Sequence, residues 1–260
     1  MICTMNIAHG REILSGQGLN MVAVLGIDRL PSTFNVVVRK SGIRIEDYAS
    51  LLLFGHGGNR LWGALNAHGM AGADPVDDYS AACAVRFVRE YLDDCPYRIL
   101  YPGSMPIPLQ QLGSLAGWHH SSPLGIGVSA TWGPWFGYRA ALLVQPELPV
   151  MTDPVTKSPC EQCKSKPCVS VCPASALSAG GPPDVDACVG HRLGQGSTCA
   201  LQCLARLACP VGTQHRYGDE QVRYFYGRSL DSIRSYQARP KQTNSMAHAP
   251  IGKSGATHGG

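Results

Sequence analysis

The stretch CEQCKSKPCVSVCP, residues 160–173, decides the fold of the second half of this chain, and CALQCLARLACP, residues 199–210, follows it closely. An x3 spacing that ends in Cys-Pro is typical of bacterial segments whose thiolates hold 4Fe-4S clusters. Two clusters need eight thiolates, and eight of the eleven cysteines lie in this region. They are Cys160, Cys163, Cys168, Cys172, Cys188, Cys199, Cys203 and Cys209. The pattern therefore predicts two 4Fe-4S clusters and a function in electron transfer.

Disulfides and zinc are the alternative uses of so many cysteines. Disulfide scaffolds are typical of small secreted chains, whereas this chain has 260 residues and opens with MICTMNIAHGREIL, which lacks the apolar run of a signal peptide. Structural zinc sites also use Cys-x2-Cys pairs, so two zinc sites are a second alternative. The Cys-Pro endings favour iron–sulfur. Cys3, Cys83 and Cys95 lie outside the pattern, and we expect Cys83 to be a small buried residue on a helix.

The composition describes a compact, loop-rich protein. The chain contains 30 glycines and 19 prolines, 15% of its residues are charged, and its net charge is +4. That charge is too small to argue for nucleic acid by itself. Residues 157–239 carry ten Lys and Arg against six Asp and Glu, which could steer an acidic electron donor or a tRNA but is also ordinary for a surface. No apolar run reaches the roughly 18 residues of a membrane span, so we expect a cytoplasmic protein with no membrane partner.

Composition also divides the chain into four regions. We expect an N-terminal extension at 1–20, an α/β domain at 21–150, a cysteine-rich module with a closing helix at 151–236, and a disordered tail rich in Gly, Ser and Pro at 237–260.

Short apolar runs and helical spacing predict the elements of these regions. Buried strands are predicted at 21–27, 49–54, 98–101 and 135–144, and helices at 75–92, 109–115 and 219–236. Asp74 is expected to cap the first of these helices, with Pro75 at its first position. Strands that alternate with helices predict an α/β (α+β) domain with a mixed sheet.

Three histidines lie where a ligand could bind. His56 belongs to GHGGN, residues 55–59, which directly follows a predicted strand. Glycines there let a ligand approach the backbone, although a half-buried histidine in a tight turn is the simpler interpretation. His119 and His120 lie in a polar segment beside Trp118. Adjacent side chains point apart in an extended chain, so we expect at most one of this pair to face a ligand.

Several segments resemble those of cobalamin-dependent iron–sulfur reductases. The segment WGPWF, residues 132–136, the Leu-Pro pair at 148–149 and the clustered cysteines are similar to those of epoxyqueuosine reductase, which is grouped with the reductive dehalogenases. The segment GPWFGYR, residues 133–139, also resembles a stretch of the cobalamin-processing CblC-type proteins.

This resemblance implies a nitroreductase-like domain that holds cobalamin, followed by a ferredoxin-like module with two 4Fe-4S clusters. The loops 102–108 and 117–139 would then border the corrin. The candidate cofactor-binding residues are Gly103, Ser104, His119, His120 and Trp135. The resemblance also implies crossed ligation, as in two-cluster ferredoxins. One cluster would be held by Cys160, Cys163, Cys168 and Cys209, and the other by Cys172, Cys188, Cys199 and Cys203.

The chain departs from epoxyqueuosine reductase at the catalytic acid. That enzyme has an Asp-Thr-Gly-Pro-type segment whose Asp donates a proton, and the corresponding stretch here is GSMP, residues 103–106. Gly103 has no proton to give, and the hydroxyl of Ser104 is a far weaker acid than a carboxyl. We therefore expect neither epoxyqueuosine as the substrate nor tRNA as a partner.

The resulting prediction is an iron–sulfur oxidoreductase whose clusters reduce a cobalamin bound in the first domain. Its expected partners are a ferredoxin- or flavodoxin-type electron donor and a small-molecule or corrinoid substrate. The alternatives are a ferredoxin-type carrier without cobalamin and, less favoured, tRNA modification. Arg192 and Arg206 follow ligand cysteines closely. They either donate hydrogen bonds to thiolates, which would raise the cluster potential, or form surface ion pairs.

Overall fold

A four-stranded antiparallel sheet forms the centre of the first domain in the structure, a computed structural model that describes residues 6–238. Across the sheet the strands are β1 (Met21–Gly26), β2 (Ser50–Gly57), β4 (Phe136–Val144) and β3 (Tyr97–Tyr101). Each neighbouring pair runs antiparallel. Cys3 and the predicted tail from residue 239 onward lie outside the described residues.

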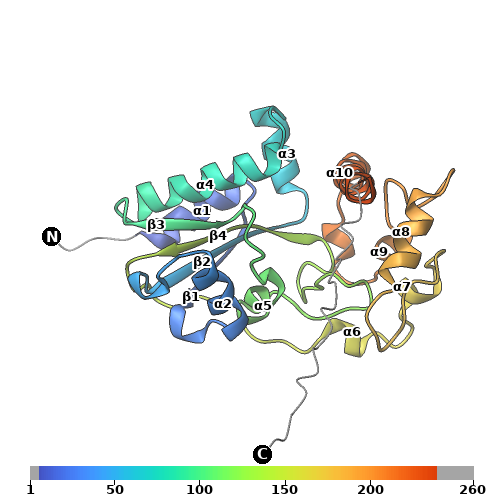
Figure 1. Ribbon diagram of the computed structural model, residues 1–260, viewed down its shortest axis with the longest axis horizontal. Coiled ribbons are helices and arrows are strands. Elements are labelled where there is room, and N and C mark those ends of the chain that lie inside the picture. The colour runs from blue at the N-terminus through green and yellow to red at the C-terminus, as the bar shows by residue number, and fades with distance from the viewer. Residues whose placement is uncertain (1–5, 239–260) are drawn as a thin grey trace, which may run out of the picture.

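Helices cover both faces of this sheet (Figure 1). One face packs against α1 (Ile7–Gly16), α3 (Arg60–His68) and α4 (Pro75–Tyr91), and the other against α2 (Ser32–Lys40) and α5 (Leu109–Leu115). Successive side chains of β2 alternate between the two, so Leu52 joins the core with Phe87 of α4 while Leu53 joins the core with Phe34 of α2. The sheet is therefore buried on both sides.

The α/β class is confirmed, but the predicted mixed sheet is wrong in strand direction. Strands that are buried on both faces read as continuous apolar runs, and such runs are typical of parallel sheets between helices. The strands β1 and β2 have this composition because helices lie on both sides of them, although their pairing is antiparallel. Here the sequence pattern indicates that the strands are buried, but it does not indicate whether they run parallel or antiparallel.

The predicted N-terminal extension contains a core helix. The Asn6 side chain accepts a hydrogen bond of 3.1 Å from the His9 amide at the start of α1. Leu14 is 2% exposed and packs in the core with residues of α4. A Cβ on Gly10 would lie 2.7 Å from the Phe87 ring, so this glycine lets the two helices approach closely. Residues 7–16 therefore pack as part of the first domain.

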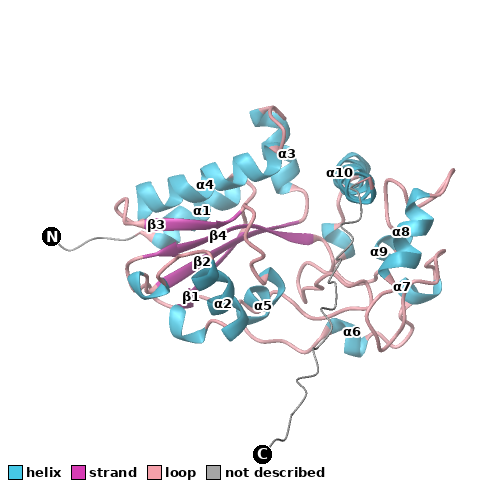
Figure 2. Cartoon of the chain, viewed as in Figure 1, coloured by secondary structure: helices cyan, strands magenta, loops and turns pink. Residues whose placement is uncertain are grey.

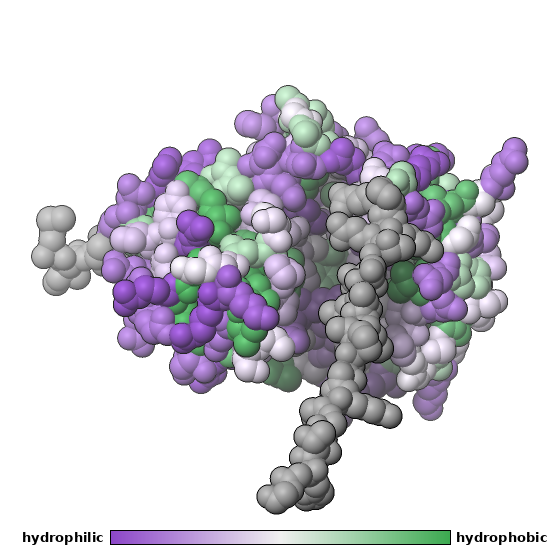
Figure 3. Space-filling view, in the orientation of Figure 1, coloured by the Kyte–Doolittle hydropathy of each residue, from purple (hydrophilic) through white to green (hydrophobic). Residues whose placement is uncertain are grey.

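The cysteine-rich region consists of short helices joined by loops, closed by one long helix (Figure 2). The short helices are α6 (Pro159–Gln162), α7 (Pro167–Ser170), α8 (Val185–Leu193) and α9 (Leu204–Leu207), and the closing helix is α10 (Asp219–Gln237). Short 3-10 turns complete the chain at Ile27–Arg29, Ile45–Asp47 and Thr213–His215. Polar residues are spread over the visible faces of both regions (Figure 3). None of the helices described between residues 6 and 238 is long and apolar enough to cross a membrane.

Backbone-level contact joins the two regions. Gly133 has a φ of +60°, and a Cβ on it would lie 2.0 Å from the carbonyl oxygen of Val211. Only glycine adopts this conformation and this approach without strain. On the other side of the junction, Tyr224 of α10 packs on Trp62 with ring centroids 5.1 Å apart. The cysteine-rich region is thus held at a fixed place beside the sheet.

Candidate functional site

The eight cysteines that the sequence predicts as cluster ligands form two groups of four. Burial raises the pKa of the Cys160 thiol, and the nearby thiols of Cys209, Cys168 and Cys163 act in the same direction. We call these four the first cysteine set. Burial likewise raises the pKa of Cys188, with Cys203, Cys172 and Cys199 acting in the same direction. These four are the second cysteine set, and the grouping agrees with the crossed arrangement implied by the resemblance.

The donor chemistry of both sets suits an iron–sulfur cluster. All eight thiols are free, and backbone amides point at several of them, as when the Arg206 amide donates to Cys203 Sγ at 3.4 Å. Among residues 6–238, no three His, Cys, Asp or Glu side chains converge as a group that could hold a metal ion. A 4Fe-4S cube takes one thiolate at each of its four irons, and each set contains four thiols.

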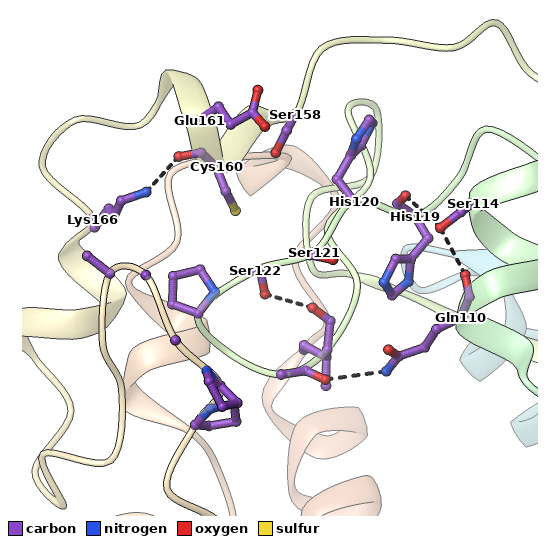
Figure 4. Close-up of a pocket in the computed structure, with 18 residues that line it drawn as sticks. Gln110, Ser114, His119, His120, Ser121, Ser122, Ser158, Cys160, Glu161 and Lys166 are labelled. Carbon is purple, nitrogen blue, oxygen red and sulfur yellow. Dashed lines mark hydrogen bonds between the residues drawn. The ribbon is translucent and has the colours of Figure 1, made fainter.

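A cavity of about 790 Å³ lies between the two regions. One wall comes from α5 and the segment 119–126, and the other from the segments 158–166 and 179–183. Cys160, a member of the first cysteine set, lies in the second wall, and its side chain points inward (Figure 4). The volume falls within the roughly 300–1,000 Å³ of small-molecule sites. The cavity therefore brings a cysteine that is predicted to bind a cluster to a space that could hold a small molecule.

His119 occupies the opposite wall of this cavity (Figure 4). It is 9% exposed, and its Nδ1 lies 3.1 Å from the hydroxyl of Tyr138. Burial, and then the neighbouring His120, lower the pKa of His119, while burial raises the pKa of Tyr138. His120 turns instead to Thr156, with Nε2 and Oγ1 3.0 Å apart. The two adjacent histidines thus have different surroundings, with His119 paired to a buried hydroxyl.

Two glycines make room for the His119–Tyr138 pair. A Cβ on Gly113 would lie 2.0 Å from the Tyr138 hydroxyl, and one on Gly127 would lie 2.3 Å from His119 Nδ1. A glycine inside a helix costs about 0.5–1 kcal/mol relative to alanine, and Gly113 lies within α5. The two glycines leave room for the His119–Tyr138 pair despite this cost. The pair is therefore a structural part of the cavity wall.

The other predicted cofactor-binding residues lie elsewhere. Gly103 and Ser104 are exposed in the loop between β3 and α5 and do not line this cavity. Trp135 is fully buried, with the guanidinium of Arg206 over its ring at 4.8 Å. A residue enclosed in this way has no free face to stack on a ligand. The structure therefore brings His119 and His120 to the cavity but not Gly103, Ser104 or Trp135.

His56 is a buried link between the two regions. The strand β2 continues to Gly57, so His56 lies within the strand and not in a tight turn as predicted. Arg139 Nε donates to its Nδ1 at 3.0 Å, and its Nε2 lies 2.9 Å from the hydroxyl of Tyr217. Burial, followed by the nearby Arg139 and Arg206, holds the pKa of His56 well below its usual value. His56 is therefore neutral at ordinary pH.

Arg192 and Arg206 are buried donors and do not form surface ion pairs. Arg192 is 9% exposed and donates to the carbonyl oxygens of Cys199 at 3.3 Å and Tyr226 at 3.0 Å. Arg206 donates to the carbonyl oxygen of Pro134 at 2.6 Å. The guanidinium of Arg206 also lies 4.8 Å from the ring centroid of Trp135 and 5.0 Å from that of Tyr217. Both cations are thus fixed beside the second cysteine set.

Sequence reasoning missed the tyrosines of this site. Tyr138 lies in β4, Tyr217 follows the last 3-10 turn, and Tyr226 lies on α10. Each places a hydroxyl beside a histidine or an arginine that is distant in sequence. Their spacing carries no signal for these contacts, because the contacts depend on how the two regions pack.

The structure defines an α/β domain, built on an antiparallel sheet, whose cavity adjoins a cysteine-rich module. Among solved structures, epoxyqueuosine reductases share this fold, which confirms the predicted type at the level of fold. The Bacillus subtilis enzyme, solved with its catalytic aspartate loop swung out of the active site, has a TM-score of 0.53 at 10% identity over 82% of this chain. An epoxyqueuosine reductase solved with a tRNA stem loop has a TM-score of 0.53 at 10% identity over 83% of this chain.

The similarity to these solved structures is limited in coverage and in sequence identity. The chain spans 66% and 68% of the lengths of these two reductases, which is about two thirds. The Caenorhabditis elegans B12-trafficking protein CblC matches 89% of this chain and 97% of its own at 13% identity, with a TM-score of 0.45. No protein-family model matches the chain, and no curated protein matches it in sequence.

The prediction that excluded tRNA as a partner is wrong. It rested on the missing acid at Gly103, which bears on the chemistry and not on what the fold can bind. The same fold occurs in an epoxyqueuosine reductase whose structure contains a tRNA-Tyr stem loop with the epoxyqueuosine modification. Loss of one catalytic side chain is therefore no ground for excluding this class of partner.

Proposed function

We propose that this protein is an iron–sulfur oxidoreductase that delivers electrons to a cobalamin held in the cavity between its two regions. The observation that carries the proposal is the position of Cys160, which belongs to the first cysteine set and also lines the cavity. A cluster on this set would lie at the cavity wall, and a cluster on the second set would lie behind it. When bound, the clusters would supply single electrons and the corrin a reducible cobalt.

The residues of the cavity have roles that follow from their contacts. Lys166 Nζ donates to the Cys160 carbonyl oxygen at 2.9 Å and so fixes the loop that carries this ligand. The hydroxyl of Tyr138 lies 3.1 Å from His119 Nδ1, and in the tautomer in which this hydroxyl donates, the proton of His119 would lie on Nε2. His119 would then hold a proton in the cavity. His120, through its bond to Thr156, would orient the segment 119–126.

Metal analysis and a cobalamin titration test the proposal on the full chain. Protein purified and reconstituted without oxygen should contain about eight irons per chain, as two cubes require. Adding hydroxocobalamin should then change the visible spectrum with saturable binding, and chemical reduction of the protein should reduce the bound corrin. His119→Gln should weaken binding or slow reduction more than the matched variant His120→Gln. Iron-loaded protein that leaves the spectrum of hydroxocobalamin unchanged would instead support the alternative of an electron carrier.

A tRNA stem loop is a second candidate for the substrate, favoured by the complex of the epoxyqueuosine reductase that shares this fold. In that case, reconstituted protein should bind a tRNA-Tyr anticodon stem loop more tightly than a DNA hairpin of the same sequence. Equal affinity for both would reduce the interaction to nonspecific charge and would remove this candidate.

A further inference from the structure

The backbone on both sides of His119 is held by neighbouring segments. The amides of Trp118 and His119 donate to the carbonyl oxygen of Gly113 in α5, at 2.8 and 3.2 Å. His120 and Val128 exchange two backbone hydrogen bonds, of 3.0 and 2.9 Å. The backbone of His119 therefore lies between a helix end and a β-bridge, and its side chain starts from a fixed place in the cavity wall.

The ring of Tyr138 is held from two sides. It stacks on Trp118, with ring centroids 6.5 Å apart and an interplanar angle of 22°, and it lies edge to face with Phe136, with centroids 5.8 Å apart and an angle of 82°. A Cβ on Gly113 would lie 2.0 Å from the Tyr138 hydroxyl, so this hydroxyl lies against the backbone of α5. These contacts fix the hydroxyl beside His119 Nδ1, 3.1 Å away.

One direction of the hydrogen bond between Tyr138 and His119 satisfies more groups than the other. A neutral histidine has one nitrogen that donates and one that accepts, whereas a phenol can do either. If Tyr138 donates, the phenol proton and the lone pair of Nδ1 both have partners. If Nδ1 donates, the phenol proton loses the acceptor that His119 offers it, and an enclosed donor without a partner costs more than a typical hydrogen bond gains. Donation by Tyr138 is therefore favoured, and it leaves the proton of His119 on Nε2.

The Nε2 edge of His119 is the part of the ring that is left for a ligand. His119 lines the cavity whereas Tyr138 does not, so Nδ1 points into the wall and the opposite edge of the ring faces the cavity (Figure 4). The charged residues of the lining, Glu161 and Lys166, lie in the other wall. The wall around His119 has uncharged polar side chains, namely Gln110, Ser114, Ser121 and Ser122. A neutral N–H in such a wall suits an uncharged acceptor, since anions are bound best by charged donors.

We propose that His119 Nε2 donates a hydrogen bond to a carboxamide oxygen at the rim of the corrin, and that Tyr138 is the positioning residue that selects this donor. The rim of a cobalamin carries uncharged carboxamide side chains, and their oxygens accept hydrogen bonds. Tyr138 acts through His119 and does not touch the ligand. This inference rests on the part of the proposed function that places a cobalamin in the cavity.

Spectral titration of the full reconstituted chain with hydroxocobalamin tests which nitrogen of His119 contacts the ligand. The amide nitrogen of glutamine can take the place of Nε2, whereas that of asparagine can take the place of Nδ1. His119→Gln should therefore raise the Kd by about threefold and His119→Asn by about tenfold, as expected for a weakened and a lost hydrogen bond. The variants are compared at equal iron content, so that a loss of folding is not read as a loss of contact.

A double-mutant cycle tests whether Tyr138 acts through His119. Tyr138→Phe should raise the Kd by about fivefold in the wild-type background, because His119 is then free to adopt either tautomer. In the His119→Asn background, the same change should alter the Kd by less than about twofold, since the residue that Tyr138 positions is gone. Tyr101→Phe is the matched control. Tyr101 lies on the neighbouring strand β3 and packs against the same core as Tyr138, and its loss of a hydroxyl should leave the Kd unchanged.

Three results would overturn the inference and leave the proposed function intact, provided that the wild-type chain binds hydroxocobalamin. They are an unchanged Kd in His119→Asn, a larger Kd in His119→Gln than in His119→Asn, and equal effects of Tyr138→Phe in the two backgrounds. Iron-loaded wild-type protein that leaves the spectrum of hydroxocobalamin unchanged would contradict the proposed function and this inference together.

Discussion

The two cysteine sets have the same number of thiols but different surroundings. The first set borders the cavity through Cys160, whose carbonyl oxygen accepts a hydrogen bond from Lys166 Nζ. At the second set, the guanidinium of Arg192 donates to the carbonyl oxygen of Cys199, and the backbone amide of Arg206 donates to Cys203 Sγ. The comparison teaches that two sets of four cysteines can have different surroundings, one open to a cavity and the other beside the buried side chain of Arg192.

The largest expected effect tests the assignment of the eight cysteines to the two sets. Cys160→Ala and Cys209→Ala should each remove the same cluster and about half of the iron, although the two residues are far apart in sequence. Cys172→Ala should remove the other cluster. Iron analysis together with the potentiometric signals distinguishes the two losses. If Cys209→Ala and Cys172→Ala removed the same cluster, the crossed arrangement would be wrong.

The next effect concerns the junction that gives the second set its enclosure. Gly133→Ala should lower the free energy of unfolding by about 3 kcal/mol, because a left-handed alanine costs about 1–2 kcal/mol and overpacking adds a similar amount. The matched control is Gly196→Ala, which has a φ of +72° but open space around its Cβ. It should cost only about 1–2 kcal/mol. Urea unfolding of the oxygen-free protein measures both, and equal losses would show that the contact with Val211 is unimportant.

A smaller effect tests the neutral histidine at that junction. The folded pKa of His56 is well below 6.5, whereas unfolded histidine takes up its proton near 6.5. The unfolded state therefore binds more protons as pH falls from 7 to 5, and stability decreases by up to about 1.4 kcal/mol per pH unit. His56→Gln should flatten the dependence of unfolding free energy on pH by this amount. His9→Gln, at a side chain that is 54% exposed, should keep the wild-type slope.

The smallest effect separates the buried contacts of α10 from its surface contacts. Arg228 of α10 pairs with Asp74 at the start of α4, and their side chains are 51% and 65% exposed. Exposed ion pairs contribute little, so Arg228→Gln should change the unfolding free energy by less than about 1 kcal/mol. It should also leave both cluster midpoints in place. A larger loss, measured by the same urea titration, would mean that the surface pair anchors the helix.

Much of the fold was predictable because burial leaves a pattern in the sequence. The apolar runs that predicted strands became β1 to β4, the helix expected at 75–92 is α4, and Cys83 is buried on it at 2% exposure. The expected cap was less accurate. Asp74 does precede α4, but its carboxylate makes no capping bond and pairs with Arg228 instead. Local sequence could not reveal this, because the partner lies on another helix.

The candidate site was predictable only where chemistry fixes spacing. The cysteine runs predicted the eight candidate ligands, and the His119–His120 pair predicted a binding segment in which at most one histidine would face a ligand, whereas both of them line the cavity. The pairing of His119 with Tyr138 needs two glycines from separate elements, and the bond between Tyr217 and His56 needs the packing of the two regions. Such contacts depend on tertiary structure, and no local periodicity encodes them.

The nesting of one cysteine set inside the other has a consequence for how the protein is made. Ribosomes release the chain from its N-terminus, so the sheet is complete at Val144 before any of the eight ligands emerges. Cys203 then completes the second set before Cys209 completes the first. Maturation factors that insert iron would therefore meet the complete second set while the first set still lacks Cys209. Tyr226 of α10 would be synthesised only after both sets.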